Sequence, residues 1–212
     1  MSYLFEQVAQ LVKKLSESGW SKADLTLLGQ ASAEKLNNVL LYLHGQIDIV
    51  RIKHTIDLAA SPGLPFDEAE MVKHDSTING KNVVEIELRS NDNLYIDGKK
   101  VVLHLSERQR GNKIVVGHEL CQELENGELV LLNSNVLDYI YNHPELFPEH
   151  WKKDENGKNR FIFFWGSIFR RPSNGRLYVR YLYWNDGGLN RNYYWLDRDW
   201  GRQLPTASLA SN

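Results

Sequence analysis

The sequence predicts an α+β fold with N-terminal helices, a central mixed α/β region and a C-terminal antiparallel β-meander. Apolar residues recur at helical spacing before residue 45, and apolar and polar residues alternate from residue 47 onward. In addition, 13 of the 23 aromatic residues lie between Phe161 and Trp200. We therefore expect three regions: a helical segment plus a strand over 1–58, a central α+β region over 59–151, and an aromatic-rich β-meander over 152–212.

The first region contains three predicted helices, over 3–16, 21–29 and 32–44, each followed closely by glycine. Three such helices are compatible with a helix-turn-helix that uses 32–43 as its recognition helix. That helix presents few cations for phosphates, so a helical bundle or a partner-docking element is the competing interpretation. A strand of about ten residues, 47–56, is expected next.

In the central region, two prolines and Gly63 predict a loop over 59–65, followed by a short helical turn at 66–72. A strand is expected over 82–88. Asp97 and Gly98 stand between two apolar runs and predict a hairpin turn. Helices are expected over 118–124 and from Asn133 or Ser134, the second ending before Pro144.

The C-terminal meander is expected from about 160 to 200, with turns at 173–175 and 185–188. On its second strand the more aliphatic face should be inside, leaving arginines interleaved with aromatics on the opposite face. The third strand adds Arg191 or Asn192, and Tyr194, depending on register. The candidate binding residues are Arg176, Tyr178, Arg180, Trp184, Arg191 and Tyr194.

Charge is distributed unevenly along the chain. Residues 1–150 contain 14 Lys and Arg against 22 Asp and Glu, whereas residues 151–212 contain 11 against 5. A basic module can face nucleic acid or another anionic partner, but the two halves can equally attract each other or present solvated faces.

Cellular location is indicated by what the chain lacks. Cys121 is the single cysteine, so no intrachain disulfide can form. The N-terminus has no basic and apolar leader, and no run of about eighteen apolar residues occurs. The sequence therefore predicts a cytoplasmic protein that does not enter a membrane.

The second half of the chain contains several distinctive runs: LNSNVLDYI at 132–140, HPELFPEHWK at 143–152, FFWGSIFR at 163–170, GRLYVRYLYW at 175–184, and YWLD at 194–197 with Trp200. On these runs the chain resembles a family of small uncharacterised bacterial proteins. The resemblance covers residues from near Lys99 to Ala207. This resemblance implies a shared C-terminal module and implies no activity.

The histidine, cysteine and acidic residues of the sequence form no recognisable catalytic or metal-binding motif. His118 and Cys121 share one helix face, and His104 precedes them in the chain. A zinc site would need at least a third protein ligand at a compatible spacing. A catalytic Cys-His pair would need a third group to orient the histidine, and the sequence indicates none. Asp197 and Asp199 could form an acid pair, although a polar strand end is the simpler interpretation. Phosphate-binding glycine motifs are absent. We therefore predict no catalytic residue, metal or cofactor.

These observations favour a non-enzymatic protein-binding module that contacts a protein partner or a second copy of itself. One alternative is a protein that binds single-stranded nucleic acid on the basic aromatic sheet. Another is an enzyme whose site is assembled from residues distant in the sequence.

Overall fold

The computed structural model describes residues 54–89 and 92–210, together with Gln10, Lys13, Lys14, Leu15, Glu17, Thr26 and Gln30. The chain forms two compact units, Met1–Ile52 and Lys53–Asn212, and every strand of the described residues belongs to the second. The helices predicted over 3–16, 21–29 and 32–44, the helix-turn-helix and most of the strand over 47–56 lie outside the described residues, apart from the scattered positions named above.

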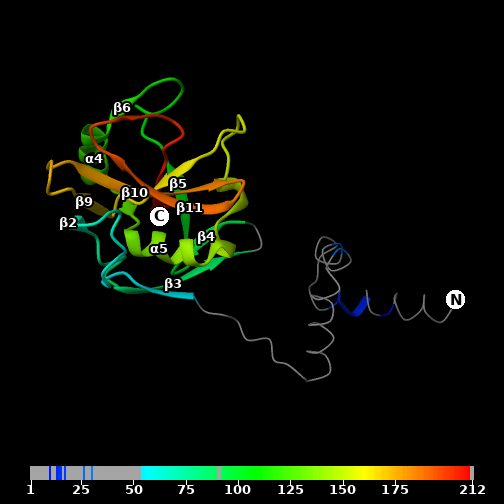
Figure 1. Ribbon diagram of the computed structural model, residues 1–212. Helices are drawn as coiled ribbons and strands as arrows, with labels where there is room; N and C mark the ends of the chain where they lie inside the picture. Colours follow the sequence, from blue (N-terminus) through cyan, green and yellow to red (C-terminus); the bar gives the residue numbers. More distant parts are fainter. Residues whose placement is uncertain are drawn as a thin grey trace. The chain divides into compact units, whose positions relative to one another are not determined.

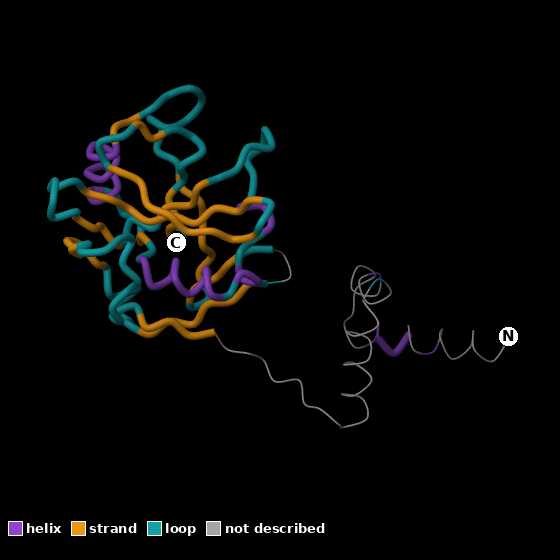
Figure 2. Tube along the Cα trace, in the orientation of Figure 1, coloured by secondary structure: helices purple, strands orange, loops and turns teal. Residues whose placement is uncertain are grey.

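The α+β prediction is wrong. Residues 54–89 and 92–210 are mostly β-structure: eleven strands form one curled sheet, and two further short strands pair with each other (Figures 1 and 2). The α-helices in this part of the chain are short: α4 (Gly117–Asn126) and α5 (Ser134–Asn142). The periodicity of the central region identified individual strands, but it did not show that they join the C-terminal strands in a single sheet.

The first part of the sheet consists of short strands, and buried residues alternate with less buried ones along 83–88 and 94–96. These strands are β1 (His54–Asp57), β2 (Glu70–His74), β3 (Val83–Leu88), β4 (Leu94–Ile96) and β5 (Lys99–His104). The helical turn predicted at 66–72 is incorrect, because β2 begins within it. The turn at Asp97 and Gly98 is confirmed: both have positive φ, and Ile96 pairs with Lys99.

The second part contains the longest strands. After β6 (Val115–Val116), α4, β7 (Val130–Leu131) and α5, the short 3₁₀ helices η1 (Pro144–Leu146) and η2 (Glu149–Trp151) lead to the aromatic tract. That tract forms β8 (Phe161–Phe163), β9 (Ser167–Arg170), β10 (Leu177–Asn185), β11 (Gly188–Trp195) and β12 (Asp199–Trp200), and β13 (Thr206–Leu209) is the last strand of the chain.

The meander prediction holds only in outline. β9, β10 and β11 are consecutive and antiparallel, and the turns between them fall where glycine and asparagine predicted them. However, β8 also pairs with β10, and β13 joins β8 to β5, so the sheet runs β1-β3-β4-β5-β13-β8-β10-β9-β2. Strands from 59–151 and from 152–212 therefore share one sheet.

Two hydrophobic cores cover opposite faces of β10. Leu182 belongs to the core that α5 completes, with Val136, Leu137 and Ile140 from the helix. Val179 belongs to the core that includes Leu120 and Leu124 of α4 and the buried aromatic residues Phe163, Trp165 and Trp200. α5 packs against β1, β10 and β11 (Figure 1). Because both faces of β10 are covered, most side chains in the middle of this strand are buried, and the polar ones must find their partners inside the protein.

Candidate functional site

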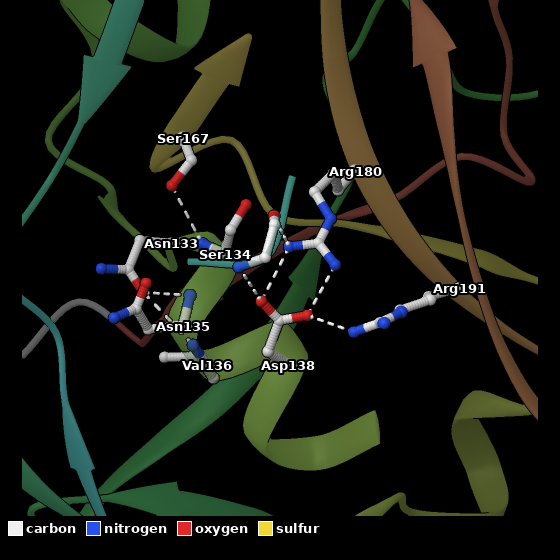
Figure 3. Close-up of polar contacts among 9 residues, drawn as sticks. Asn133, Ser134, Asn135, Val136, Asp138, Ser167, Arg180 and Arg191 are labelled. Carbon is white, nitrogen blue, oxygen red and sulfur yellow. Dashed lines mark hydrogen bonds and ion pairs between the residues drawn. The ribbon is translucent and has the colours of Figure 1, made fainter. Parts of the chain in front are cut away.

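Arg180 lies in the middle of β10 and is 3% exposed. A buried guanidinium is stable only when its N–H groups are paired. Here Arg180 donates to both carboxylate oxygens of Asp138 on α5, over 2.9 Å from Nη1 and 2.5 Å from Nη2, and from Nη1 to the carbonyl oxygen of Gly63 over 2.8 Å (Figure 3). The bidentate pair joins the sheet to the helix, and the bond to Gly63 joins both to the 59–65 loop.

Asp138 has two further donors. Arg191 on β11 donates from Nη1 to Oδ1 over 2.7 Å, and the Gly63 N–H donates to Oδ2 over 2.8 Å (Figure 3). Two guanidinium groups thus share one carboxylate, which leaves a local excess of positive charge. Because the Arg191 side chain is 42% exposed and Arg180 is buried, this charge is available to a ligand at Arg191.

A pocket of about 400 Å³ opens beside this network. Its polar groups come from β1, the 59–65 loop, α5 and β11, and they include hydroxyl, amide, carboxylate and guanidinium groups that can bind a small polar group or a peptide backbone. The lining residues are Ile56, Asp57, Ser61, Pro62, Gly63, Asn135, Asp138, Tyr139, Asn142 and Arg191.

The N-terminus of α5 holds the pocket wall in place. Asn133, one of the two residues predicted as the cap, caps the helix, since its Oδ1 accepts from the N–H groups of Asn135 and Val136. Its Nδ2 donates to the carbonyl oxygens of Leu58 and Asp75, and Asn135 Nδ2 donates to those of Asp57 and Ala60. The cap therefore ties the helix to the loop that lines the pocket.

Ser167 completes the cap from another strand. Its Oγ accepts from the N–H of Ser134 over 3.0 Å (Figure 3) and lies 2.9 Å from Nδ1 of His74. Gly166 must be glycine here, because a Cβ at that position would lie 2.8 Å from the backbone nitrogen of Asn133. Close contact between the β8–β9 connection and the helix start follows from these residues.

The six residues predicted as a binding surface are divided between two faces. Register places Tyr178, Arg180 and Trp184 on the same face as Arg191, so the choice between Arg191 and Asn192 falls on Arg191. Tyr194 pairs with Val179 on the opposite face, where its ring lies 5.3 Å from that of Trp200. Arg176 lies just before β10 and packs over the Trp195 ring.

The expectation that the arginine-bearing face is exposed is wrong for Tyr178 and Arg180. Tyr178 is fully buried, and its ring lies 5.0 Å from that of Phe66. Trp184 is half-buried beneath Lys152, whose Nζ is 3.7 Å from the ring centroid. Arg176 remains 45% exposed and, with Arg191, forms the accessible part of the predicted surface.

The other predicted candidates have separate partners. His118 Nε2 lies 2.9 Å from Oδ1 of Asp197, and burial is the main cause that lowers the pKa of His104. Burial also raises the pKa of the Cys121 thiol to about 11. β11 ends at Trp195, before the two aspartates considered as an acid pair, and Asp199 belongs to β12, where it pairs with Val116.

Sequence reasoning missed a second group beside the pocket. His54 on β1, His143 at the end of α5 and Glu145 in η1 each present one donor atom, and these atoms lie within 4.8 Å of one another. In the sequence, only His143 and Glu145 stand close together, on either side of Pro144. Their proximity to His54 could not be predicted, because His54 belongs to a strand that is distant in the chain.

Comparison with protein-family models, curated proteins and solved structures found no match to this chain. The resemblance of the second half to a bacterial family stays a prediction. No helix among the described residues is long and apolar enough to cross a membrane.

Proposed function

We propose that this chain is a non-enzymatic protein-binding module that binds an extended segment of a protein partner along the edge of β11. The observation that carries the proposal is the unpaired edge itself. Among residues 54–89 and 92–210, β11 pairs with β10 alone, and its eight residues form a continuous register with that strand. Such an edge presents backbone donors and acceptors to another strand.

The register identifies the backbone groups that face outward. The Leu196 N–H donates to the Leu177 carbonyl oxygen over 3.0 Å, and ladder bonds of an antiparallel pair involve every second residue. The backbone groups of Leu189, Arg191, Tyr193 and Trp195 therefore point away from β10. The Tyr193 N–H is already bonded to Asn192 Oδ1 over 2.8 Å, so Leu189, Arg191 and Trp195 supply the available donors.

Other sheet edges suit this role less well. β2 pairs only with β9 among the described strands, but its register is interrupted between Met71 and Lys73. Bulges of this kind impede strand addition. β1 is only four residues long. β11 is longer, is uninterrupted and carries Arg191.

Arg191 also indicates the chemistry of the partner. Its described hydrogen bond uses one of the five guanidinium N–H groups, and its guanidinium packs on the Tyr141 ring 4.4 Å from the centroid. An acidic side chain on the added strand can pair with the remaining donors. We therefore propose an extended segment that carries a carboxylate opposite Arg191.

The nucleic-acid alternative has less support from the side chains. Arg180 and Tyr178 are buried, and Asp138 accepts hydrogen bonds from both Arg180 and Arg191. A stacking platform needs exposed rings beside unpaired cations. Arg176 and Arg191 remain for phosphate contacts, and this is a small set for a strand-binding surface.

The test compares Arg191→Pro with Arg191→Ala, using acidic peptides selected from a random library against the unmodified chain. Both variants lose the guanidinium, but only proline also loses the outward N–H. We expect Arg191→Ala to weaken peptide binding about threefold and Arg191→Pro a further tenfold or so.

Amide hydrogen exchange provides the second measurement. Bound peptide should slow exchange at Leu189 and Arg191, while Asn190, whose N–H faces β10, should change little. Equal binding by the two variants would contradict strand addition. Binding of oligo(dT) that falls steeply with salt, and that both substitutions weaken equally, would instead support the nucleic-acid alternative. Loss of a dimer in Arg191→Pro alone would identify a second copy of the chain as the partner.

A further inference from the structure

Two histidines and a glutamate meet where β1 passes the C-terminal end of α5. His54 belongs to β1, His143 is the C-cap of α5, and Glu145 is in the following 3₁₀ helix. One donor atom from each residue lies within 4.8 Å of the others. Tyr139, which lines the pocket described above, also contacts this group, so the cluster adjoins the pocket.

Local backbone geometry holds His143 and Glu145 together. The His143 N–H donates to the carbonyl oxygens of Tyr139 and Ile140, which anchors this residue to the last turn of the helix. Pro144 is the first residue of the 3₁₀ helix, a position that suits its fixed φ and its missing N–H. Glu145 Oε1 consequently lies 3.1 Å from His143 Nδ1.

Tyr139 orients both imidazole rings. Its ring is stacked on that of His143 with centroids 4.4 Å apart, and its hydroxyl oxygen lies 3.1 Å from His54 Nδ1. The two imidazole centroids are 5.1 Å apart. A hydroxyl group bonded to one ring nitrogen sets the tautomer and orientation of that ring, as outer partners of metal-bound histidines do.

The donor set matches a particular class of cation. Two imidazole nitrogens and one carboxylate oxygen suit Zn²⁺ and other divalent transition metals, whereas Ca²⁺ and Mg²⁺ prefer oxygen ligands alone. Bonds of about 2.0–2.2 Å in a tetrahedral arrangement place donor atoms roughly 3.3–3.5 Å apart. The His143 and Glu145 atoms are already near this separation, so a modest approach of the His54 ring completes the set.

We propose that His54, His143 and Glu145 bind one divalent transition-metal ion of the zinc class. Glu145 is exposed and both histidines are half-buried, so a coordination position stays open to water or to a group held in the neighbouring pocket. The site goes beyond peptide binding at β11 and does not depend on it.

The test uses the full-length chain without an affinity tag, stripped of metal by a chelator and titrated with Zn²⁺ by calorimetry and with Co²⁺ by visible absorption. We expect saturable binding of one ion and an intense Co²⁺ spectrum typical of a low-coordinate site. His54→Ala, His143→Ala and Glu145→Gln should each weaken Zn²⁺ binding about a hundredfold, and Tyr139→Phe about tenfold.

His118→Ala and His150→Ala are the matched controls. Both are exposed histidines paired with an aspartate, Asp197 and Asp92, but neither belongs to the cluster. Both variants should bind Zn²⁺ like the unmodified chain. Glu145 is exposed, and glutamine has nearly the same shape as glutamate. Glu145→Gln therefore tests the site even where a histidine variant fails to fold.

Absence of saturable Zn²⁺ binding, or unchanged binding by Glu145→Gln, would overturn the proposal. Equal losses in the cluster variants and in His118→Ala would show adventitious surface binding and would overturn it as well. Because the readout is metal binding, its failure is distinguishable from failure of peptide binding at β11.

Discussion

Arg180 illustrates how a single charged side chain can connect several elements of this fold. It is almost fully buried, and its partners are a carboxylate on α5 and a carbonyl group of the 59–65 loop. Arg191 bonds to the same carboxylate but remains partly exposed. The same residue type therefore has a structural role at one position and presents an accessible charge at the other.

We expect Arg180→Met to lower the free energy of unfolding by about 3–4 kcal/mol, because it breaks a buried ion pair and leaves Asp138 with fewer donors. Arg191→Met should cost less than about 1 kcal/mol, since its ion pair is partly exposed to solvent. Urea unfolding of the two variants measures this difference. Equal losses would show that burial of Arg180 has no special energetic role.

Cys121 gives a pH-dependent prediction at the same scale. Burial raises the pKa of its thiol from the ordinary 9.0 to about 11, so the thiol stays protonated at neutral pH and the reactive thiolate grows only as the pH approaches 11. At pH 8 its thiolate fraction should be about a hundredfold below that of an unshifted thiol.

The rate of alkylation by iodoacetamide, followed by mass spectrometry, measures this shift. The rate should rise about tenfold per pH unit up to pH 10 or so in the folded protein. The urea-unfolded chain is the control and should level off near the ordinary pKa. A folded-state plateau at pH 9 would contradict the expected protection.

At the scale of elements, the start of α5 determines where the pocket wall lies. Asn133 uses its oxygen for the helix and its nitrogen for two carbonyl groups of other segments. Ser167 contributes a further bond to the first turn. The helix is thereby joined to β9 and to the loop after β1, although its own nine residues contain no basic residue in the last turn to support it.

Replacement of Asn133 by alanine should lower the free energy of unfolding by about 3 kcal/mol. Loss of the cap costs about 1 kcal/mol, and the two unpaired carbonyl groups cost about 1 kcal/mol each. Asn142→Ala, at the exposed end of the same helix, should change stability by less than about 0.5 kcal/mol. Thermal unfolding followed by circular dichroism compares the two, and similar midpoints would refute the structural role of Asn133.

At the scale of the whole molecule, both hydrophobic cores and the entire eleven-stranded sheet lie within Lys53–Asn212. The strand order brings β5 against β13 and β10 against β8, so residues far apart in the chain stabilise one another. This unit therefore contains the interactions that a cooperative fold requires.

A chain that begins at Lys53 should unfold in one cooperative transition, and its amides in β10 should keep slow hydrogen exchange. A chain that begins at Val83 is the control, since it lacks β1, β2 and the core residues Ile56 and Leu58. That shorter chain should show no cooperative transition. Loss of cooperativity in the longer chain would contradict the independence of Lys53–Asn212.

Several features could be predicted because neighbouring residues determine them. The cap at Asn133, the end of α5 before Pro144 and the turn at Asp97 and Gly98 depend on contacts within a few positions along the chain. Aromatic and aliphatic runs also predicted the long strands correctly. In contrast, the helical turn at 66–72 failed, because pairing of β2 with β9 decides the conformation there.

The sequence by itself thus determined the start and end of α5, the hairpin turns and the strands that flank those turns. Only the tertiary structure decided that these strands form one sheet, that α5 buries Arg180, and that His54 lies beside His143 and Glu145. Short-range periodicity reports which side chains share a face of an element. It does not report which element covers that face, because strand order and register follow from packing between segments that are distant in the chain.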